Sequence, residues 1–411
     1  MRKSPKLKIG AFFMSENRWT AEDEGFMALA LTLAEKGYSN VSPNPYVGAI
    51  LVKEGRIIGE GYHLKAGDAH AEVNAIRAAK KHASAAEIEG STIYVTLEPC
   101  CHVGKTGACT EAIVNAGITR VVSAMEDPNP KVGGQGHAYL RAQGVDVATG
   151  LLEARARHIN RHFIHNQLTK RPFVTLKAAL SLDGKLATKT GDSQWITCPK
   201  AREKTHYIRG IHDAILIGKG TLIADNPSLT VRYGYEGRGK APLRVVLIQD
   251  FTGISEELTL FNDIRANDIT ADGINSDDIR GTLIISTEPA IKQAGKLIET
   301  LTNKGVEIVE VVSADGATIS IKSVLDALNK RGIMSVMLEG GAGIYDAFLN
   351  AGYVDEFALF YGPRLIGDRD AYELWATSDT TALEHAPILT IFETERVGES
   401  LYVGAFFKGD V

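Results

Sequence analysis

The stretches Ala69-His70-Ala71-Glu72 and Glu98-Pro99-Cys100-Cys101-His102, followed by Cys109, decide the fold of the first part of the chain. One histidine and two cysteines supply three zinc ligands and leave the fourth position of a tetrahedral site open for water. A glutamate two residues after the histidine is the acid and base that a zinc deaminase requires. We therefore predict that His70, Cys100 and Cys109 bind one Zn²⁺ per chain and that Glu72 transfers protons.

Hydrolytic removal of an amino group moves a proton from the attacking water to the departing nitrogen, and a carboxylate beside the metal can make both transfers. We expect His70 and Glu72 in the first turn of one helix, and Cys100 ahead of a second helix that contains Thr110. The partial positive charge at a helix N-terminus favours thiolates there. Adjacent side chains point in different directions, so Cys101 is predicted to be a spectator.

Composition limits the classes of protein to consider. The chain has 411 residues, which favours two domains, and its 44% apolar and 23% charged residues are typical of a soluble globular protein. A net charge of −5 argues against a nucleic-acid substrate. Three of the four cysteines crowd beside one histidine, which indicates a metal site in a reducing cytoplasm rather than disulfides. No apolar run is long enough for a membrane helix.

Strands and helices alternate through both halves, which predicts α/β layers. In the first half we predict helices at 20–36, 69–82 and 110–116 and strands at 46–53, 56–62, 91–97 and 120–125. In the second half we predict strands at 173–178, 214–217, 243–248, 282–286, 306–311 and 333–338, and helices around 324–329 and 344–349.

Three segments stand apart from this alternation. Residues 1–19 are predicted to be a loosely ordered leader, and the acidic residues 250–280 a surface excursion. Residues 151–168 are predicted to form a solvated helix that links domains 20–168 and 169–411. Its histidines at 158, 162 and 165 could suggest a second metal site, but no carboxylate or cysteine accompanies them.

Beyond the zinc motif, the chain resembles a known family, the bifunctional riboflavin-biosynthesis enzymes, in which a pyrimidine deaminase is fused to a reductase. Cys109 follows Cys100 by nine positions, whereas nucleoside and nucleic-acid deaminases space these cysteines as C-x-x-C. Further matching stretches in the first half are residues 43–48, 61–63 and 127–130. The matches in the second half are residues 177–184, 193–197, 221–227 and 338–341. The chain departs from the family at Cys101, where a small polar residue is usual, and at Gly107-Ala108, where two prolines are usual.

The resemblance implies a cytidine-deaminase-like three-layer α/β/α domain, followed by a dihydrofolate-reductase-like α/β domain. It assigns zinc to His70, Cys100 and Cys109 and proton transfer to Glu72. It implies that the pyrimidine and its ribose phosphate contact Asn44, His63, His102, Lys105, Asp127 and Asn129. A lysine suits a phosphate, and Asn and Asp side chains can read a polar ring edge. Asn44 and Asn129 each lie beside prolines, so both are also ordinary turn residues.

In the second domain the resemblance places NADPH against Ala179, Trp195, Thr221, Asp225 and the turn Gly341, Ala342, Gly343, Ile344, Tyr345, Asp346 and Ala347. It places the substrate against Ser193, Arg209, Leu229, Arg232 and Glu339. Arg209 and Arg232 suit a phosphate because guanidinium binds it bidentately. Lys177 is our candidate for polarising the ribose carbonyl while hydride arrives. The glycine turn lies outside any G-x-G-x-x-G context, so a Rossmann domain is not expected.

The expected function is therefore zinc-dependent deamination of a 2,5-diamino-6-ribosylaminopyrimidinone phosphate, followed by NADPH-dependent reduction of its ribosyl group. The expected partner is this small molecule, with neither nucleic acid nor a membrane involved, in a cytoplasmic homo-oligomer (a dimer or a tetramer). One rival is a nucleoside or nucleic-acid deaminase with an unrelated appendage, and it predicts C-x-x-C spacing. The other is a binding protein with structural zinc, in which Cys101 or His102 would be the fourth ligand.

Overall fold

The computed structural model describes residues 19–101, 107–130, 132–236, 238–262, 281–312, 318–378 and 380–408. Its contacts divide the chain into two compact units. The first unit contains the chain up to Lys36, Val47–His63 and Ala69–His158, and the second contains Gly37–Tyr46, Leu64–Asp68 and the chain from Ile159 onward. The last boundary between the two units therefore follows residue 158, whereas the sequence predicts the domain boundary after residue 168. Two short segments of the first half also cluster with the second unit.

The first unit is built on a five-stranded sheet in the order β2-β1-β3-β4-β5. Strand β1 pairs antiparallel with β2 and β3, while β3, β4 and β5 are parallel. The strands are β1 (Gly48–Lys53), β2 (Arg56–Tyr62), β3 (Thr92–Val95), β4 (Arg120–Ser123) and β5 (Asp146–Thr149). The helices are α1 (Ala21–Ala34), α2 (Ala71–Ala79), α3 (Ala85–Ile88), α4 (Cys109–Asn115), α5 (Gln135–Ala142) and α6 (Glu153–Ile159).

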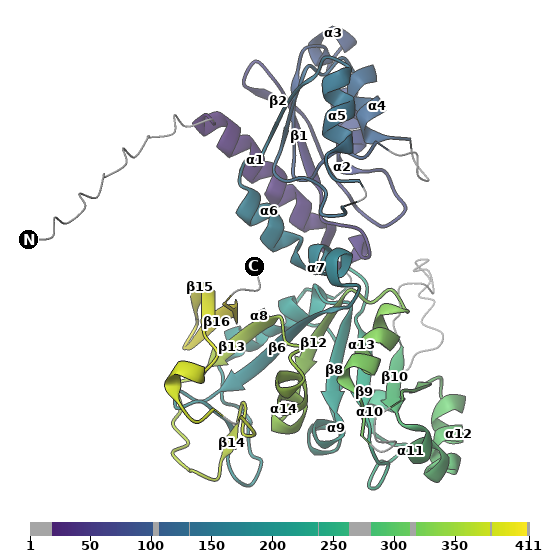
Figure 1. Cartoon of the computed structure of the whole chain (residues 1–411), viewed down its shortest axis with the longest axis vertical. Coiled ribbons are helices and arrows are strands. Elements are labelled where there is room, and N and C mark those ends of the chain that lie inside the picture. The colour runs from purple at the N-terminus through teal and green to yellow at the C-terminus, as the bar shows by residue number, and fades with distance from the viewer. Residues whose placement is uncertain are drawn as a thin grey trace, which may run out of the picture. The chain divides into compact units, whose positions relative to one another are not determined.

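Glycines let helices approach both faces of this sheet. A Cβ on Gly48 would lie 2.0 Å from the Ala30 carbonyl oxygen of α1. A Cβ on Gly61 would lie 2.4 Å from the Ala71 carbonyl oxygen of α2. Gly61 pairs with the neighbour of Gly48 in the β1–β2 register, so the two glycines face opposite sides of the sheet. Helices α1 and α2 therefore cover opposite faces, which confirms the three-layer α/β/α prediction (Figure 1).

The second unit contains a nine-stranded sheet in the order β11-β10-β9-β8-β12-β6-β13-β16-β15. All strands that stand between β11 and β13 in this sheet order are parallel to one another and to these two strands. The sheet continues from β13 with β16 and β15, which form an antiparallel hairpin. The bounds are β6 (Phe173–Leu180), β8 (Ala214–Gly218), β9 (Leu243–Leu247), β10 (Thr282–Ser286), β11 (Glu307–Glu310), β12 (Ser335–Glu339), β13 (Glu356–Tyr361), β15 (Leu389–Val397) and β16 (Ser400–Phe407). A separate pair is formed by β7 (Lys185–Ala187) and β14 (Tyr372–Glu373).

Helices and short 3-10 turns complete the second unit. They are α7 (Arg161–Thr169), α8 (Pro199–Gly210), α9 (Lys219–Asp225), α10 (Thr259–Asn262), α11 (Glu288–Gln293), α12 (Gly295–Asn303), α13 (Ile321–Asn329), α14 (Ala342–Asn350) and η3 (Leu383–His385). A further 3-10 turn, η1 (Glu35–Val41), spans the division between the units.

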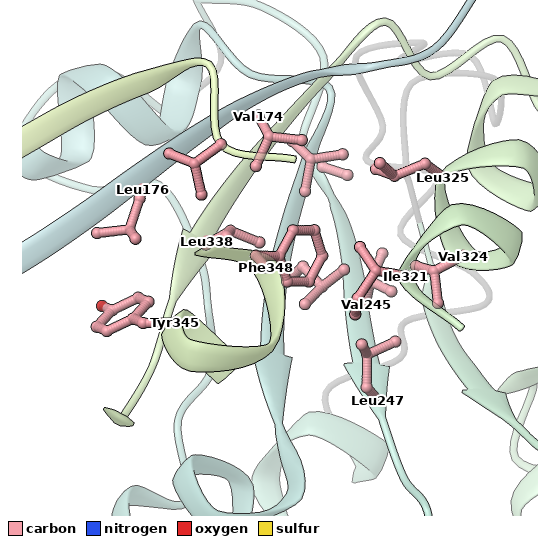
Figure 2. Packing of buried hydrophobic residues seen from close by; sticks show 14 of the residues in the cluster. Val174, Leu176, Val245, Leu247, Ile321, Val324, Leu325, Leu338, Tyr345 and Phe348 are labelled. Atoms are coloured by element: carbon pink, nitrogen blue, oxygen red, sulfur yellow. The ribbon is translucent and has the colours of Figure 1, made fainter. Parts of the chain in front are cut away.

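Alternate residues of the central parallel strands enter two separate cores. Leu216, Val245 and Leu338 belong to a core shared with α13 and α14, while Ile215 and Val246 belong to a core shared with α9, α10 and α12. Figure 2 shows the first of these cores, with the side chains of Tyr345 and Phe348 of α14 lying against residues of the sheet. Both faces of the sheet are therefore buried, as the apolar strand sequences predict.

The structure corrects several expectations. Residues 151–168 form two helices, broken at the buried Asn160. The solvated-helix prediction is wrong for His162, because its ring packs against those of Phe173 and His212 at 4.9 and 4.8 Å. Part of the predicted surface excursion is also buried, since Leu260 and Phe261 of α10 enter the core. Residues 263–280 lie outside the described part of the chain.

The sequence patterns do not predict α3, α5 and β5 in the first unit, nor β7, α8, α9, α11, α12, β13, β14, β15 and β16 in the second. The predicted leader, apart from Trp19, also lies outside the described ranges. Within those ranges, none of the helices combines the length and the apolar character needed to cross a membrane.

Candidate active sites

Three segments of the first unit meet at the predicted zinc ligands. His70 is the N-cap residue of α2, Cys109 is the first residue of α4, and Cys100 follows β3. The His70 Nδ1 atom lies 3.2 Å from the Cys109 Sγ atom and 3.5 Å from the Cys100 Sγ atom. One ligand atom from each of the three residues lies within 4.8 Å of the others, and this is the one such group in the described ranges.

These distances fit a zinc ion. Zinc bonds of ~2.1 Å to nitrogen and ~2.3 Å to sulfur, at tetrahedral angles, separate the two ligand atoms by roughly 3.6 Å. Cys101 is half-buried and is not part of the ligand group, so it does not provide the fourth ligand that a structural site would need. The other candidate fourth ligand, His102, lies outside the described residues.

Glu72 lies in the first turn of α2, two residues after His70. Glu72 is only 3% exposed, and its Oε2 atom is buried without a hydrogen-bond partner in the described structure. Burial raises the pKa of Glu72 to about 7. A buried carboxyl group with a raised pKa can accept a proton and return it in one reaction.

The two cysteines differ in their charge state. The neighbouring Cys109 side chain lowers the pKa of the Cys100 thiol, and His70 acts in the same direction against burial. The pKa of Cys109 is raised by Cys100 and by burial. The site therefore already favours one thiolate, and a bound divalent cation would favour the second.

Predicted pyrimidine-binding residues lie close to this centre. The His63 ring is buried and meets the His70 ring edge to face, with 5.4 Å between centroids. Asp127 and Asn129 form a turn in which the Asn129 backbone N–H donates to Asp127 Oδ1 at 2.8 Å. The Asp127 backbone N–H donates to Glu98 Oε2 at 3.1 Å, which connects this turn to the Pro99-Cys100 segment.

The structure does not test three other predicted substrate residues of the deaminase. Asn44 belongs to the segment Gly37–Tyr46, which clusters with the second unit. His102 and Lys105 lie outside the described residues. Their contacts with the substrate stay predictions.

In the second unit, neighbouring parallel strands bring Lys177 and Glu339 side by side, because these residues pair in the β6–β12 register. Arg209 of α8 binds Glu339 through two hydrogen bonds, Nε to Oε1 and Nη2 to Oε2, the latter at 2.7 Å. The Arg209 Nη1 atom also donates to the Thr230 carbonyl oxygen at 3.0 Å. A lysine, a glutamate and an arginine thus share one nearly buried cluster.

Electrostatics within this cluster favour an ionised Glu339. Burial opposes its charge, but the Arg209 guanidinium prevails and lowers the pKa of Glu339 to about 2. Burial also lowers the pKa of the Lys177 ammonium group, while Glu339 acts against that shift. A lysine with a lowered pKa gives up its proton more readily than an ordinary surface lysine.

Arg232 is exposed, unlike Arg209. Its guanidinium donates to the hydroxyls of Thr230 and Ser228. Its backbone N–H donates to Nδ1 of His206 at 3.0 Å, which requires that nitrogen to be unprotonated. Burial, with Arg209 acting in the same direction, lowers the pKa of His206 to about 4. Sequence reasoning missed His206, although its position one helical turn before Arg209 could have indicated it.

The predicted NADPH residues at the glycine turn come together at the start of α14. Gly341 is the N-cap residue, and its N–H donates to Thr221 Oγ1 at 3.1 Å. A Cβ on Gly340 would lie 2.8 Å from Ile344, so a larger residue would disturb this turn. The Tyr345 hydroxyl donates to the Lys177 carbonyl oxygen at 2.5 Å and accepts from Gly340 N–H at 3.1 Å.

The remaining predicted reductase residues differ in exposure. Trp195 is 58% exposed, and the Arg202 guanidinium stacks on its ring at 4.5 Å. Asp225 is exposed and Ser193 and Ala179 are half-buried, whereas Leu229 is a core residue. Tyr345 and Ala347 contribute to the other core, so neither side chain points freely into solvent.

Comparison with known proteins decides the family. The riboflavin biosynthesis protein RibD of Bacillus amyloliquefaciens is 40% identical over 388 residues, which cover 94% of this chain and 96% of that protein. The chain belongs to the RibD family. The RibD protein of Escherichia coli is 35% identical, with 92% of this chain and 97% of that protein covered. The model of the RibD C-terminal domain matches residues 172–402. The model of the cytidine and deoxycytidylate deaminase zinc-binding region matches residues 20–125.

Solved structures agree with this assignment. Acinetobacter baumannii RibD has a TM-score of 0.78 at 31% identity, with 94% of this chain and 99% of that chain covered. A Thermotoga maritima diaminohydroxyphosphoribosylaminopyrimidine deaminase/5-amino-6-(5-phosphoribosylamino)uracil reductase has the same TM-score at 35% identity and the same coverage. The chain is therefore a bifunctional enzyme of riboflavin biosynthesis, with a zinc-dependent deaminase and a reductase, as the sequence predicts.

Proposed function

We propose that the first active site deaminates 2,5-diamino-6-ribosylamino-4(3H)-pyrimidinone 5′-phosphate and that the second then reduces the ribosyl group to a ribityl group with NADPH. The observation that carries the proposal is the group of His70, Cys100 and Cys109 beside the buried Glu72, in one chain with the cluster of Lys177, Glu339 and Arg209. The names of the Thermotoga maritima relative's two activities describe the same pair of reactions.

For the deaminase, we propose that His70, Cys100 and Cys109 hold Zn²⁺. A zinc ion at such a site supplies a Lewis acid that makes water nucleophilic near neutral pH. Glu72 takes a proton from the attacking water and delivers it to the departing amine nitrogen. His63, Asp127 and Asn129 orient the pyrimidine, and the predicted roles of Asn44, His102 and Lys105 are part of the same proposal.

For the reductase, we propose that NADPH lies along Trp195, Thr221 and the start of α14. The exposed N–H groups at a helix N-terminus suit a dinucleotide phosphate, and NADPH supplies the hydride. Lys177 provides the positive charge and the proton at the atom of the ribosyl group that gains the electron pair. Tyr345 is better suited to holding the Lys177 strand than to contacting NADPH, since its hydroxyl already binds the Lys177 carbonyl and Gly340 N–H.

The two arginines take different roles in this proposal. Arg232 has an exposed guanidinium and is the candidate for the ribose phosphate. Arg209 gives three of its N–H groups to Glu339 and to the Thr230 carbonyl, so we propose that it orients Glu339 rather than forming a symmetric fork with Arg232. We further propose catalytic domains at 20–168 and 169–411 and a cytoplasmic homo-oligomer.

The test is an assay of the full chain with the pyrimidine phosphate, in which ammonia release and NADPH absorbance are followed together. We expect ammonia release without NADPH, and NADPH oxidation only after deamination. Absence of ammonia release from the zinc-loaded enzyme would refute the assigned substrate. NADPH oxidation that precedes ammonia release would refute the proposed order.

A further inference from the structure

Glu98 is a buried carboxylate that no step of the proposed reaction uses. It lies two residues before Cys100 and is 6% exposed. Its Oε2 atom accepts hydrogen bonds from the backbone N–H groups of Asp127, at 3.1 Å, and Gly134, at 2.8 Å. Its Oε1 atom accepts from the backbone N–H of His137, at 3.1 Å. One side chain therefore binds three amides from a separate part of the chain.

Two of these amides belong to the N-terminus of α5. Gly134 is its N-cap residue and has no side chain with which to accept a hydrogen bond from the first turn. Glu98 supplies that acceptor from another segment, and its negative charge also suits the partial positive charge of a helix N-terminus. Position 136 must be small as well, because a Cβ on Gly136 would lie 2.0 Å from the Pro99 carbonyl oxygen. Helix α5 is thus fitted directly against the turn that carries Cys100.

The third amide belongs to Asp127, in the turn that is proposed to contact the pyrimidine. The Glu98 backbone N–H also donates to the Met125 carbonyl oxygen at 3.0 Å, so Glu98 binds the start of this turn through both its main chain and its side chain. A hydrogen bond to a charged group is worth about 1.5–3 kcal/mol. On the same carboxylate oxygen, one such bond holds the start of the turn and the other holds the start of α5, so both segments are tied to the strand end that carries Cys100.

We propose that Glu98 is a positioning residue that holds the substrate turn Asp127–Asn129 at a fixed place relative to Cys100, and that it thereby sets the deaminase KM. This inference rests on the proposed role of Asp127 and Asn129 in substrate binding. Zinc binding depends less on Glu98, because Cys100 is also held by Thr110, whose N–H donates to the Cys100 carbonyl oxygen at 3.2 Å. His70 and Cys109 are carried by their own helices.

The experiment compares the full-length zinc enzyme with its Glu98→Gln variant. Glutamine keeps one oxygen but turns an NH₂ group toward N–H donors, so at least one of the three hydrogen bonds is lost. We expect a deaminase KM that is about 10- to 100-fold higher, from the loss of one or two charge-assisted hydrogen bonds. We expect zinc content and NADPH oxidation of the deaminated pyrimidine to be unchanged, and faster hydrogen exchange at Asp127 and Gly134.

Glu126→Gln is the matched control, because Glu126 is an exposed carboxylate beside the same turn, and we expect it to leave KM unchanged. If Glu98→Gln does not fold, Glu98→Asp replaces it, since aspartate keeps the charge but is one methylene too short for all three amides. An unchanged KM, or loss of zinc before any change in KM, would overturn the inference. Absence of ammonia release from the wild-type enzyme would instead refute the proposed substrate.

Discussion

The ion pair of Arg209 and Glu339 permits a quantitative prediction for the second unit. Both side chains are nearly buried, with 14% and 11% of their surfaces exposed. The fall in the pKa of Glu339 from 4.5 to about 2 corresponds, at about 1.4 kcal/mol for each pH unit, to roughly 3 kcal/mol of stability. Removal of one partner of a buried pair costs about 3–5 kcal/mol, because the other charge is left without compensation.

We therefore expect Arg209→Met to lower the free energy of unfolding by about 3 kcal/mol, the lower end of that range, because Lys177 remains beside Glu339. In the double variant Arg209→Met/Glu339→Met neither charge of the pair remains, but Lys177 loses its carboxylate neighbour, so only part of the lost stability should return. The measurement is urea unfolding followed by tryptophan fluorescence, since Trp195 and Trp375 both lie in the second unit. Losses that simply add in the double variant would refute the reasoning.

The same pair predicts a pH dependence. A carboxyl group whose pKa is lower in the folded state stabilises the fold above its unfolded pKa. The contribution of Glu339 should therefore be complete above about pH 4.5 and should disappear as pH falls toward 2. Glu339→Met should flatten this part of the stability profile, and an unchanged profile would contradict the assignment.

Three further predictions concern other parts of the chain. Arg232→Ala should raise the reductase KM at least tenfold and leave deamination unchanged, whereas an unchanged reductase KM would remove Arg232 from the phosphate site. Zinc chelation should stop ammonia release but not NADPH oxidation with the deaminated pyrimidine; loss of both activities would contradict the assignment of the metal to one site. Phe348→Ala should lower the free energy of unfolding by about 3–5 kcal/mol, because Phe348 is fully buried in the core. A loss below about 1 kcal/mol would contradict the burial of this side chain.

The zinc ligands could be predicted from the sequence because their chemistry depends on residue types at short spacings. His70 and Glu72 are two residues apart at the start of α2, and Cys109 is the first residue of α4. The apolar strands were predictable for a related reason, since strands buried on both faces are nearly continuous in hydrophobic residues. The short elements α5 and β5 lack a long periodic pattern, so they were missed. The longer elements α8, β15 and β16 were missed as well, and most residues of β15 are not buried, so it lacks the continuous apolar run of the central strands.

Side-chain pairing between distant segments could not be predicted. Arg209 and Glu339 are 130 residues apart, and only the sheet order brings β12 and α8 together. Their pairing changes the role expected for Arg209. The hydrogen bonds of Glu98 depend in the same way on where α5 begins. His162 was misread because the sequence does not reveal which face of α7 meets Phe173 and His212.

The central claim is that one chain carries two separate reactions and that Glu72 transfers protons in only one of them. The most direct test is Glu72→Gln in the full-length zinc enzyme, with zinc content, ammonia release and NADPH oxidation measured on the same preparation. Loss of a general acid and base slows a reaction by about 10²- to 10⁴-fold. We expect ammonia release to fall by at least 100-fold, while the zinc content and the oxidation of NADPH with the deaminated pyrimidine are unchanged. Ammonia release at the wild-type rate, or loss of both activities with zinc retained, would contradict the account.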